Sequence, residues 1–295
     1  MLATAATRAD APPAFEQLRW TAPGSEYVLL SAQPATCLAS DDALVRSGRA
    51  LFATPTLLGG QAAKAGLSCA SCHVNGRGNP HFLLAGVSGA PGTADVTNSF
   101  FSAARGNARF DPVAIPDLAK PGKVAREPAA RALEPFIRTL IVEEFGGDEP
   151  TPAMLAAIAA YVRAIAPCDP DGSEARHLDD QLRAIDDGMA AAALMIERKD
   201  RAGVRLSVAS IRHQLGLISE RYAGPGLARD RAALLAASRE LQAVGDREDA
   251  GLLLRRWKTG FDGGLAKRLR RDTDRSLYDD DRLARALRPS APRRQ

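Results

Sequence analysis

Two cysteines three positions apart, with a histidine directly after the second, constrain this chain more than any other feature. They are Cys69, Cys72 and His73, in the segment CASCH. Cysteines at i and i+3 lie on one face of a helix, where both sulfurs can bond the two vinyl groups along one edge of a porphyrin. The next residue then points its imidazole at the iron as the proximal ligand. The spacing therefore predicts one covalently bound haem c per chain.

A C-x-x-C segment has two other interpretations, a redox-active dithiol and one half of a zinc site. A thioredoxin-like dithiol is expected within a βαβ pattern, and a zinc site needs a second pair of ligands at matching spacing. The chain has four cysteines, and the other two, Cys37 and Cys168, stand alone in the sequence. Neither context is present, so the sequence favours haem attachment.

The residues around the motif resemble a known family. The stretches 47–52 (SGRALF) and 66–73 (GLSCASCH) resemble the start of a haem domain in the bacterial di-haem cytochrome c peroxidases and the related MauG-type enzymes. The stretch 95–101 (DVTNSFF) stands where that family has an Arg-Asn-x-Pro-like segment, and 132–166 resemble the closing helix of cytochrome c domains. The resemblance covers residues 41–167 and implies a cytochrome c-like fold there.

The chain departs from that family in its number of haems. It has a single C-x-x-C-H motif, so the family's two-haem relay cannot exist within it. The sequence therefore predicts a monohaem cytochrome that carries single electrons. Two alternatives stay open: a peroxidase-like haem enzyme with an open or weakly held iron, and a haem-based sensor coupled to the C-terminal half.

The sixth iron ligand has two candidates. Soluble electron carriers close the iron with Met or His, whereas enzymes leave one position open. No Met lies between 74 and 153. His81 stands eight residues beyond His73, a reach of about 26 Å when extended, and the alternative is a surface histidine. Met154 begins the last helix expected in this domain, where core packing is the alternative. Lysine ligation and an open iron also stay open.

Two adjacent carboxylates, Glu143 and Glu144, precede a Gly-Gly turn. A carboxylate beside an open haem could move protons during work on a peroxide. With His81, they are the candidate catalytic residues. The alternative for the two glutamates is a solvated helix end.

Composition favours an all-α fold. Hydrophobic residues make up 45% of the 295 residues but aromatic residues only 5%, and alanine and leucine favour helix. A run of turn-forming residues at 167–173 marks a boundary. We expect an N-terminal extension (1–40), a cytochrome c-like haem domain with long loops (41–172), an antiparallel helical bundle (173–287) and a disordered tail (288–295).

The expected helices differ between the two halves. In the haem domain we expect helices near 41–52, 67–73, 128–144 and 151–166, with a long loop at 74–127 that needs a ligand to order it. Ser40 or Asp41 could cap the first of these helices, and Thr151 with Pro152 would start the last. The second half contains two apolar stripes at spacings of 4 and 3, typical of packed helices: Leu178, Leu182, Ile185, Met189, Ala192, Ile196; and Val204, Val208, Ile211, Leu215, Ile218, Tyr222.

The rest of the second half is expected to contain shorter helices, at 228–244, 247–259 and 275–287. Gly260 and the pair at 263–264 should interrupt the chain after the second of these.

Charge limits the partners. A net charge of +4 is too small to argue nucleic-acid binding, and no apolar run is long enough to span a membrane. The charge is uneven: residues 1–172 carry 14 basic and 16 acidic side chains, and residues 173–295 carry 25 and 19. Within the second half, a basic run would suit an acidic redox partner protein, and a solvated helix face is the alternative: Lys267, Arg268, Arg270 and Arg271.

The resemblance to c-type cytochromes implies a periplasmic location, because haem is attached outside the cytoplasm. That compartment permits disulfides, so we expect a Cys37–Cys168 bond, which would stabilise the domain by about 4 kcal/mol. The stretch 9–11 (ADA) has the A-x-A form of a cleavage site. Residues 1–11 are therefore expected to be the remnant of a signal peptide, although Pro12 directly after the site disfavours cleavage.

Overall fold

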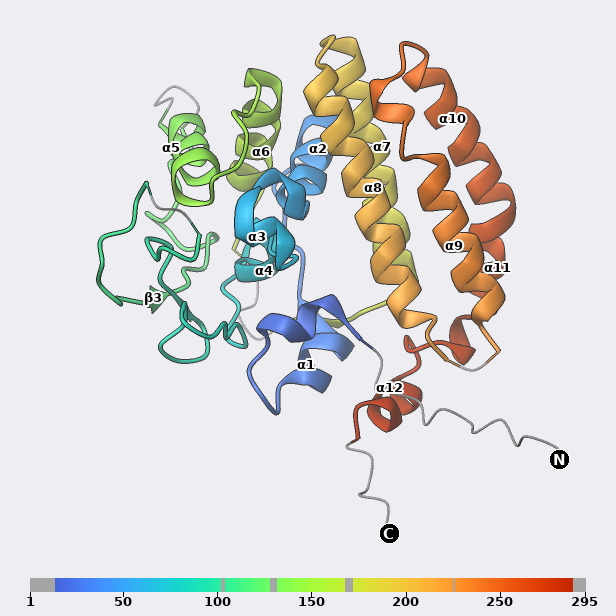
Figure 1. The fold of residues 1–295 in the computed structure, drawn as a ribbon, viewed down its shortest axis with the longest axis horizontal. Helices are drawn as coiled ribbons and strands as arrows, with labels where there is room; N and C mark the ends of the chain where they lie inside the picture. The colour runs from blue at the N-terminus through green and yellow to red at the C-terminus, as the bar shows by residue number, and fades with distance from the viewer. Residues whose placement is uncertain (1–13, 102–103, 128–131, 168–171, 225, 289–295) are drawn as a thin grey trace, which may run out of the picture.

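The computed structural model describes residues 14–101, 104–127, 132–167, 172–224 and 226–288 (Figure 1). It contains 57% helix and 5% strand, which confirms the predicted all-α class. Among the described residues, no helix is both long and apolar enough to cross a membrane.

Helices α2 (Ala43–Phe52) and α6 (Pro152–Ala164) form the centre of the first half and pack tightly against each other. The cap of α2 is Asp42, whose side chain accepts hydrogen bonds from the amides of Leu44 and Val45, and not the predicted Ser40 or Asp41. Asp42 has the extended backbone that an N-cap needs. The two helices cross at Gly48, where any Cβ atom would collide with the carbonyl group of Ala157.

The start of α6 follows the prediction. The Thr151 hydroxyl accepts a hydrogen bond from the amide of Met154, and Pro152 occupies the first helical turn. The helix buries Tyr161, whose ring meets Phe52 of α2 edge-on with centroids 5.2 Å apart.

The chain between α2 and α6 has little regular structure, as expected for 74–127. Only short elements occur among its described residues. These elements are η2 (Pro55–Leu57), α3 (Gly60–Lys64), α4 (Cys69–Cys72), η3 (Val74–Gly76), β2 (Thr93–Ala94), β3 (Val113–Ala114), α5 (Leu133–Thr139) and η5 (Leu140–Glu144). The predicted helices near 67–73 and 128–144 correspond to α4 and to α5 with η5, and the other elements were not predicted. Strands β2 and β3 pair antiparallel, and part of the helix predicted at 128–144 lies outside the described residues.

The N-terminal segment is tied to the rest of the protein. It contains η1 (Glu16–Trp20), α1 (Glu26–Ser31) and β1 (Ala32–Pro34). Strand β1 pairs antiparallel with β4 (Ser173–Ala175). The segments just before α2 and just after α6 therefore meet in one small sheet.

The longest helices lie in the second half. Helices α7 (Leu178–Glu197) and α8 (Arg201–Arg221) pack along their length, and α9 (Ala228–Glu240) packs on α8. Every residue of the predicted α8 stripe is buried. In the α7 stripe Met189, in the middle of the helix, is only partly buried, and Ile196, in its last turn, is exposed.

The predicted interruption at Gly260 and 263–264 is wrong. Helix α10 (Ala250–Gly260) continues through a π-helical turn, η7 (Phe261–Ala266), into α11 (Lys267–Arg271). Gly260 keeps right-handed helical angles, and the wider π turn accommodates the extra residue without ending the helix. The short helix η6 (Val244–Asp246) precedes α10, and η8 (Thr273–Arg275) and α12 (Asp280–Ala286) follow α11.

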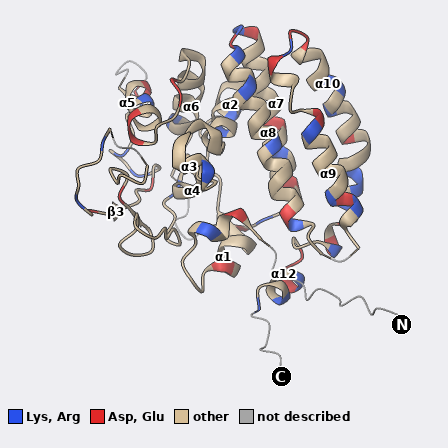
Figure 2. Ribbon diagram, in the orientation of Figure 1, with Lys and Arg blue, Asp and Glu red and all other residues tan. Residues whose placement is uncertain are grey.

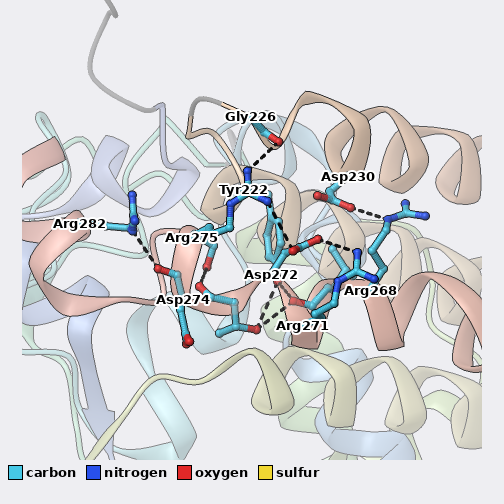
Figure 3. Close-up of polar contacts among 12 residues, drawn as sticks. Tyr222, Gly226, Asp230, Arg268, Arg271, Asp272, Asp274, Arg275 and Arg282 are labelled. Carbon is cyan, nitrogen blue, oxygen red and sulfur yellow. Dashed lines mark hydrogen bonds and ion pairs between the residues drawn. The ribbon is translucent and has the colours of Figure 1, made fainter.

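A polar cluster fastens α11 to the end of α8 and the start of α9 (Figure 3). The Tyr222 hydroxyl donates to the carbonyl oxygen of Leu269, and Arg268 Nε lies 2.6 Å from Asp230 Oδ1. Tyr222 and Asp230 are both buried, so these bonds fix the position of α11 on the other helices.

Helix α2 lies between α6 and α7 (Figure 1). Its Arg46 and Arg49 both bond the buried Asp187 of α7, with Nε–Oδ distances of 3.0 and 2.7 Å. Buried apolar residues of the two halves form one continuous core. Basic and acidic residues alternate over the C-terminal helices (Figure 2).

Candidate haem attachment site

Helix α4 carries the two cysteines of the motif on a single turn. Ser68 and Ser71 start this turn with a capping box, in which Ser71 Oγ accepts from the Ser68 amide at 3.0 Å. Cys69 and Cys72 are both free thiols and both partly exposed. The i, i+3 spacing therefore places two available sulfurs on one short helix, as the sequence predicted.

The environment of the two thiols opposes the redox-dithiol interpretation. Burial raises the pKa of both Cys69 and Cys72 to about 12. A redox-active cysteine needs a lowered pKa, because the thiolate is the nucleophile. The shift at Cys69 and Cys72 is in the opposite direction, so it does not favour a redox-active dithiol.

His73 is held by its ring nitrogen. Nδ1 lies 3.1 Å from the carbonyl oxygen of Pro116, an acceptor that requires the proton to be on Nδ1. Nε2 then keeps its lone pair for a metal, in the arrangement that metal-binding histidines use. Burial lowers the pKa of His73 to about 4, so the ring is neutral at pH 7. The ring of Phe52 lies 6.4 Å away, centroid to centroid.

The chain just after His73 is fixed by two unusual residues. Asn75 adopts a left-handed conformation (φ 51°), and its side chain donates to the carbonyl oxygen of Pro34 at 2.7 Å. Gly76 (φ 78°) has no room for a side chain, because a Cβ would lie 2.5 Å from Ile165 Cδ1. These contacts place the motif against the end of α6.

Asn79 closes the C-terminal end of α4. This buried residue donates from its amide to Cys72 O and from Nδ2 to Ser71 O, each at 2.9 Å. Its Oδ1 accepts from the amide of His81. This role was not predicted, because Asn79 lies seven residues beyond the end of α4 and no local pattern connects the two.

Arg126 fixes the loop that carries Pro116. Its guanidinium donates to the carbonyl oxygens of Ile165 at 2.6 Å and Leu118 at 2.7 Å, which joins this loop to the end of α6. Next to Pro116, Asp117 pairs with Arg77 at 2.8 Å. Both Pro116 and Arg126 were missed, because they lie more than forty residues from His73 and no local pattern connects them.

The two candidates for the sixth ligand remain predictions. His81 is partly exposed, and its backbone is bonded to Asn79 and Ala22. Met154 is buried in the core, in the first turn of α6, as the packing alternative requires. No described hydrogen bond or ring contact joins either side chain to His73.

The two glutamates differ sharply. Glu143 is half-exposed and pairs with Arg138 at 3.5 Å, as a solvated helix end would. Glu144 is buried, so the solvated alternative is wrong for it. Its Oε1 lies 3.4 Å from Arg105, its Oε2 has no partner among the described residues, and burial raises its pKa. The π-helical turn η5 causes this difference, because it changes the direction of side chains at its end.

Cys37 lies beside the end of α6. It is disulfide-bonded, and its carbonyl oxygen accepts from the amide of Ala166 at 2.9 Å. Cys168, its predicted partner, lies outside the described residues, as do residues 1–11. The Cys37–Cys168 pairing therefore stays a prediction. Ala166, which bonds Cys37, stands two positions before Cys168 in the sequence.

The part of the chain that the structure describes contains no group of three or more His, Cys, Asp or Glu side chains that could hold a metal ion. Comparison of the chain with protein-family models, curated proteins and solved structures found no match.

Proposed function

We propose that this protein is a periplasmic monohaem c-type cytochrome that carries single electrons. In this proposal residues 41–172 form a cytochrome c-like haem domain, similar to one half of the di-haem peroxidase and MauG family, and residues 173–287 form a helical bundle beside it. The observation that carries the proposal is the hydrogen bond from His73 Nδ1 to Pro116, which leaves Nε2 available next to two free cysteines on one turn.

The residues of the motif fit a haem. Cys69 and Cys72 would hold its vinyl groups through thioether bonds, and His73 would bind the iron. The bound haem supplies a reversible one-electron couple. The chain keeps His73 neutral and oriented through Pro116, and Arg126 holds that loop in place. The apolar side chains packed around the motif exclude water, which tunes the potential of a metal centre.

An acidic redox protein is the partner that suits this chain. Residues 173–295 carry six more basic than acidic side chains, whereas the haem half is nearly neutral. Opposite charges on two proteins raise the rate of encounter at low ionic strength. The C-terminal helices would then act as a docking or scaffold module.

Glu144 supports a second candidate function, a peroxidase-like enzyme. A buried carboxyl group with a raised pKa and an unpartnered oxygen among the described residues is suited to move a proton. The sensor alternative draws on a different contact, the two arginines of α2 on Asp187 of α7, which join the haem half to the C-terminal helices.

Haem content tests the proposal directly. The chain, exported from a host with haem-attachment machinery, is expected to carry one haem that survives denaturing electrophoresis, and its mass is expected to be that of chain plus one haem. Cys69→Ala with Cys72→Ala removes that haem, whereas Cys37→Ala keeps it. A wild-type chain without covalent haem would contradict the proposal.

Spectroscopy separates the two functions. An electron carrier is expected to be fully low-spin, with a spectrum that carbon monoxide and peroxide leave unchanged. A high-spin ferric form that reacts with peroxide would instead support the enzyme. In that case Glu144→Gln should slow the peroxide reaction at least tenfold, while the half-exposed Glu143→Gln changes it little.

A further inference from the structure

A groove of about 680 Å³ separates α9 from α10 and η7. It lies among the C-terminal helices, on the opposite side of the molecule from α5 and β3 (Figure 1). The haem proposal makes no use of it, and every residue that lines it is described.

The groove exists because one wall is built of alanine. Ala233, Ala236 and Ala237 occur at i, i+3 and i+4, so they share one face of α9. The opposite wall carries larger apolar side chains. That wall consists of Leu253, Trp257, Phe261 and Leu265.

The two walls are held apart in a fixed geometry. Trp257 Nε1 donates to the carbonyl oxygen of Ala237 at 3.2 Å. This carbonyl is one of the last four of α9, which have no partner in the regular hydrogen-bond pattern of the helix. The indole also stacks on Phe261, with ring centroids 5.0 Å apart and an interplanar angle of 14°. This hydrogen bond across the groove keeps it preformed, as in most small-molecule sites.

The groove has one cation that other side chains leave available. Arg268 lines it but is paired with the buried Asp230 at 2.6 Å (Figure 3). Arg256 also lines it, is exposed, and forms no ion pair with any described residue. Glu240 at the rim lies beyond ion-pair distance of Arg256. A ligand with an apolar body and a single negative charge would therefore match this surface.

We propose that the groove binds a fatty acid, with its carboxylate beside Arg256 and its alkyl chain along the alanine face of α9. The volume falls within the range of about 300–1,000 Å³ that small-molecule pockets span, and apolar walls with a few polar groups are their usual lining. Apolar contact with Trp257 and Phe261 supplies most of the affinity, and Arg256 selects an anionic head group.

The test is a titration of the haem-loaded protein with dodecanoate below its critical micelle concentration. Calorimetry and the fluorescence of Trp257 measure binding. We expect saturable binding at one site per chain. Trp257→Phe should remove the fluorescence response. Binding that fails to saturate would overturn the proposal, and this outcome is independent of whether haem is attached.

Three variants locate the ligand. Ala236→Phe fills the groove and should weaken binding at least about tenfold, the effect of 1.4 kcal/mol. Arg256→Ala should weaken it about fivefold, as expected for an exposed ion pair, and should abolish the preference for dodecanoate over the uncharged dodecanol. The neighbouring Arg255→Ala, which is exposed but outside the groove, should have no effect.

Two results would overturn this assignment. One is equal losses for Arg255→Ala and Arg256→Ala. The other is a dimer in sedimentation that Ala236→Phe dissociates, since a second copy of the chain would then occupy the groove. Circular dichroism of each variant distinguishes loss of binding from loss of folding.

Discussion

Asp187 is the residue on which the contact between the two halves depends most. It is buried on α7 and accepts hydrogen bonds from two arginines of α2, one turn apart. A buried carboxylate is stable only where its charge is matched, so the three side chains function as a unit. The arginines come from the predicted first helix, but nothing in the sequence indicated their partner, which lies more than 130 residues further along the chain.

Asp187→Ala should lower the free energy of unfolding by about 3 kcal/mol, because it removes the buried partner of both Arg46 and Arg49 and leaves the largely buried Arg49 with only the exposed Asp41. Urea unfolding at pH 7 measures this. The neighbouring Asp186→Ala is the control: Asp186 is half-exposed and pairs with Lys258, so its loss should cost less than about 1 kcal/mol. Equal losses for the two variants would show that Asp187 does not join the halves.

Glu220 should make stability depend on pH. Burial raises its pKa from an ordinary value of 4.5 to about 7, against the lowering effect of the hydrogen bond from the Glu16 amide. The folded protein thus binds a proton that the unfolded chain releases, so this contribution is complete below about pH 4.5 and disappears as pH rises through 7.

Glu220→Gln removes this proton while keeping an oxygen to accept from the Glu16 amide. Compared with the wild type, the variant should be more stable at pH 8 and no more stable at pH 4.5. Urea unfolding at both values measures the difference. The opposite effect of His213, whose pKa is lowered to about 4, cancels because both proteins contain it. A difference that is the same at both pH values would contradict the assignment.

At the scale of elements, the close crossing of α2 and α6 depends on Gly48. The resemblance to cytochrome c domains covered both helices, and the signals that start α6 were local: a threonine cap followed by proline. The crossing itself had no such signal, because a glycine inside a helix usually lowers the stability of that helix and does not by itself indicate a close contact.

Gly48→Ala should therefore destabilise the protein by about 3 kcal/mol, because the new methyl group collides with the Ala157 carbonyl on α6. Gly216→Ala is a matched control, since that glycine is also helical and has open space around it. The control should be neutral or stabilise by up to about 1 kcal/mol. Thermal unfolding of the two variants tests this, and a neutral Gly48→Ala would show that the helices separate easily.

Local signals explain which elements the sequence predicted. Helices α7 and α8 were found because apolar residues recur at spacings of 4 and 3 over five turns. The π-helical turn η7 was missed because its glycines indicate a break, and η5 was missed because nothing in a sequence distinguishes a π turn from an α turn. At the site, the motif residues were predicted, but their partners Pro116, Asn79 and Arg126 come from distant segments, which only the folded chain brings together.

At the scale of the whole molecule, the two halves differ in what orders them. Residues of 74–127 make few regular backbone hydrogen bonds. Phe82 and Val87 are fully buried in the core, but the other apolar side chains of this stretch include several that are only partly buried: Leu84, Ile115, Leu118 and Val124. Helices α7 and α8 bury continuous stripes on each other. The proposed haem would supply the missing contacts for the first half alone.

Loss of haem should therefore loosen one half and leave the other folded. In the Cys69→Ala, Cys72→Ala variant, amide hydrogen exchange in 74–127 should be at least about tenfold faster than in the haem-loaded wild type, while α7 and α8 keep their protection. Wild-type chain produced without haem-attachment machinery keeps every cysteine and is the control: it should show the same faster exchange as the variant. Uniformly faster exchange would instead mean that the continuous core makes both halves one cooperative unit, and unchanged exchange in 74–127 would mean that haem does not order this loop.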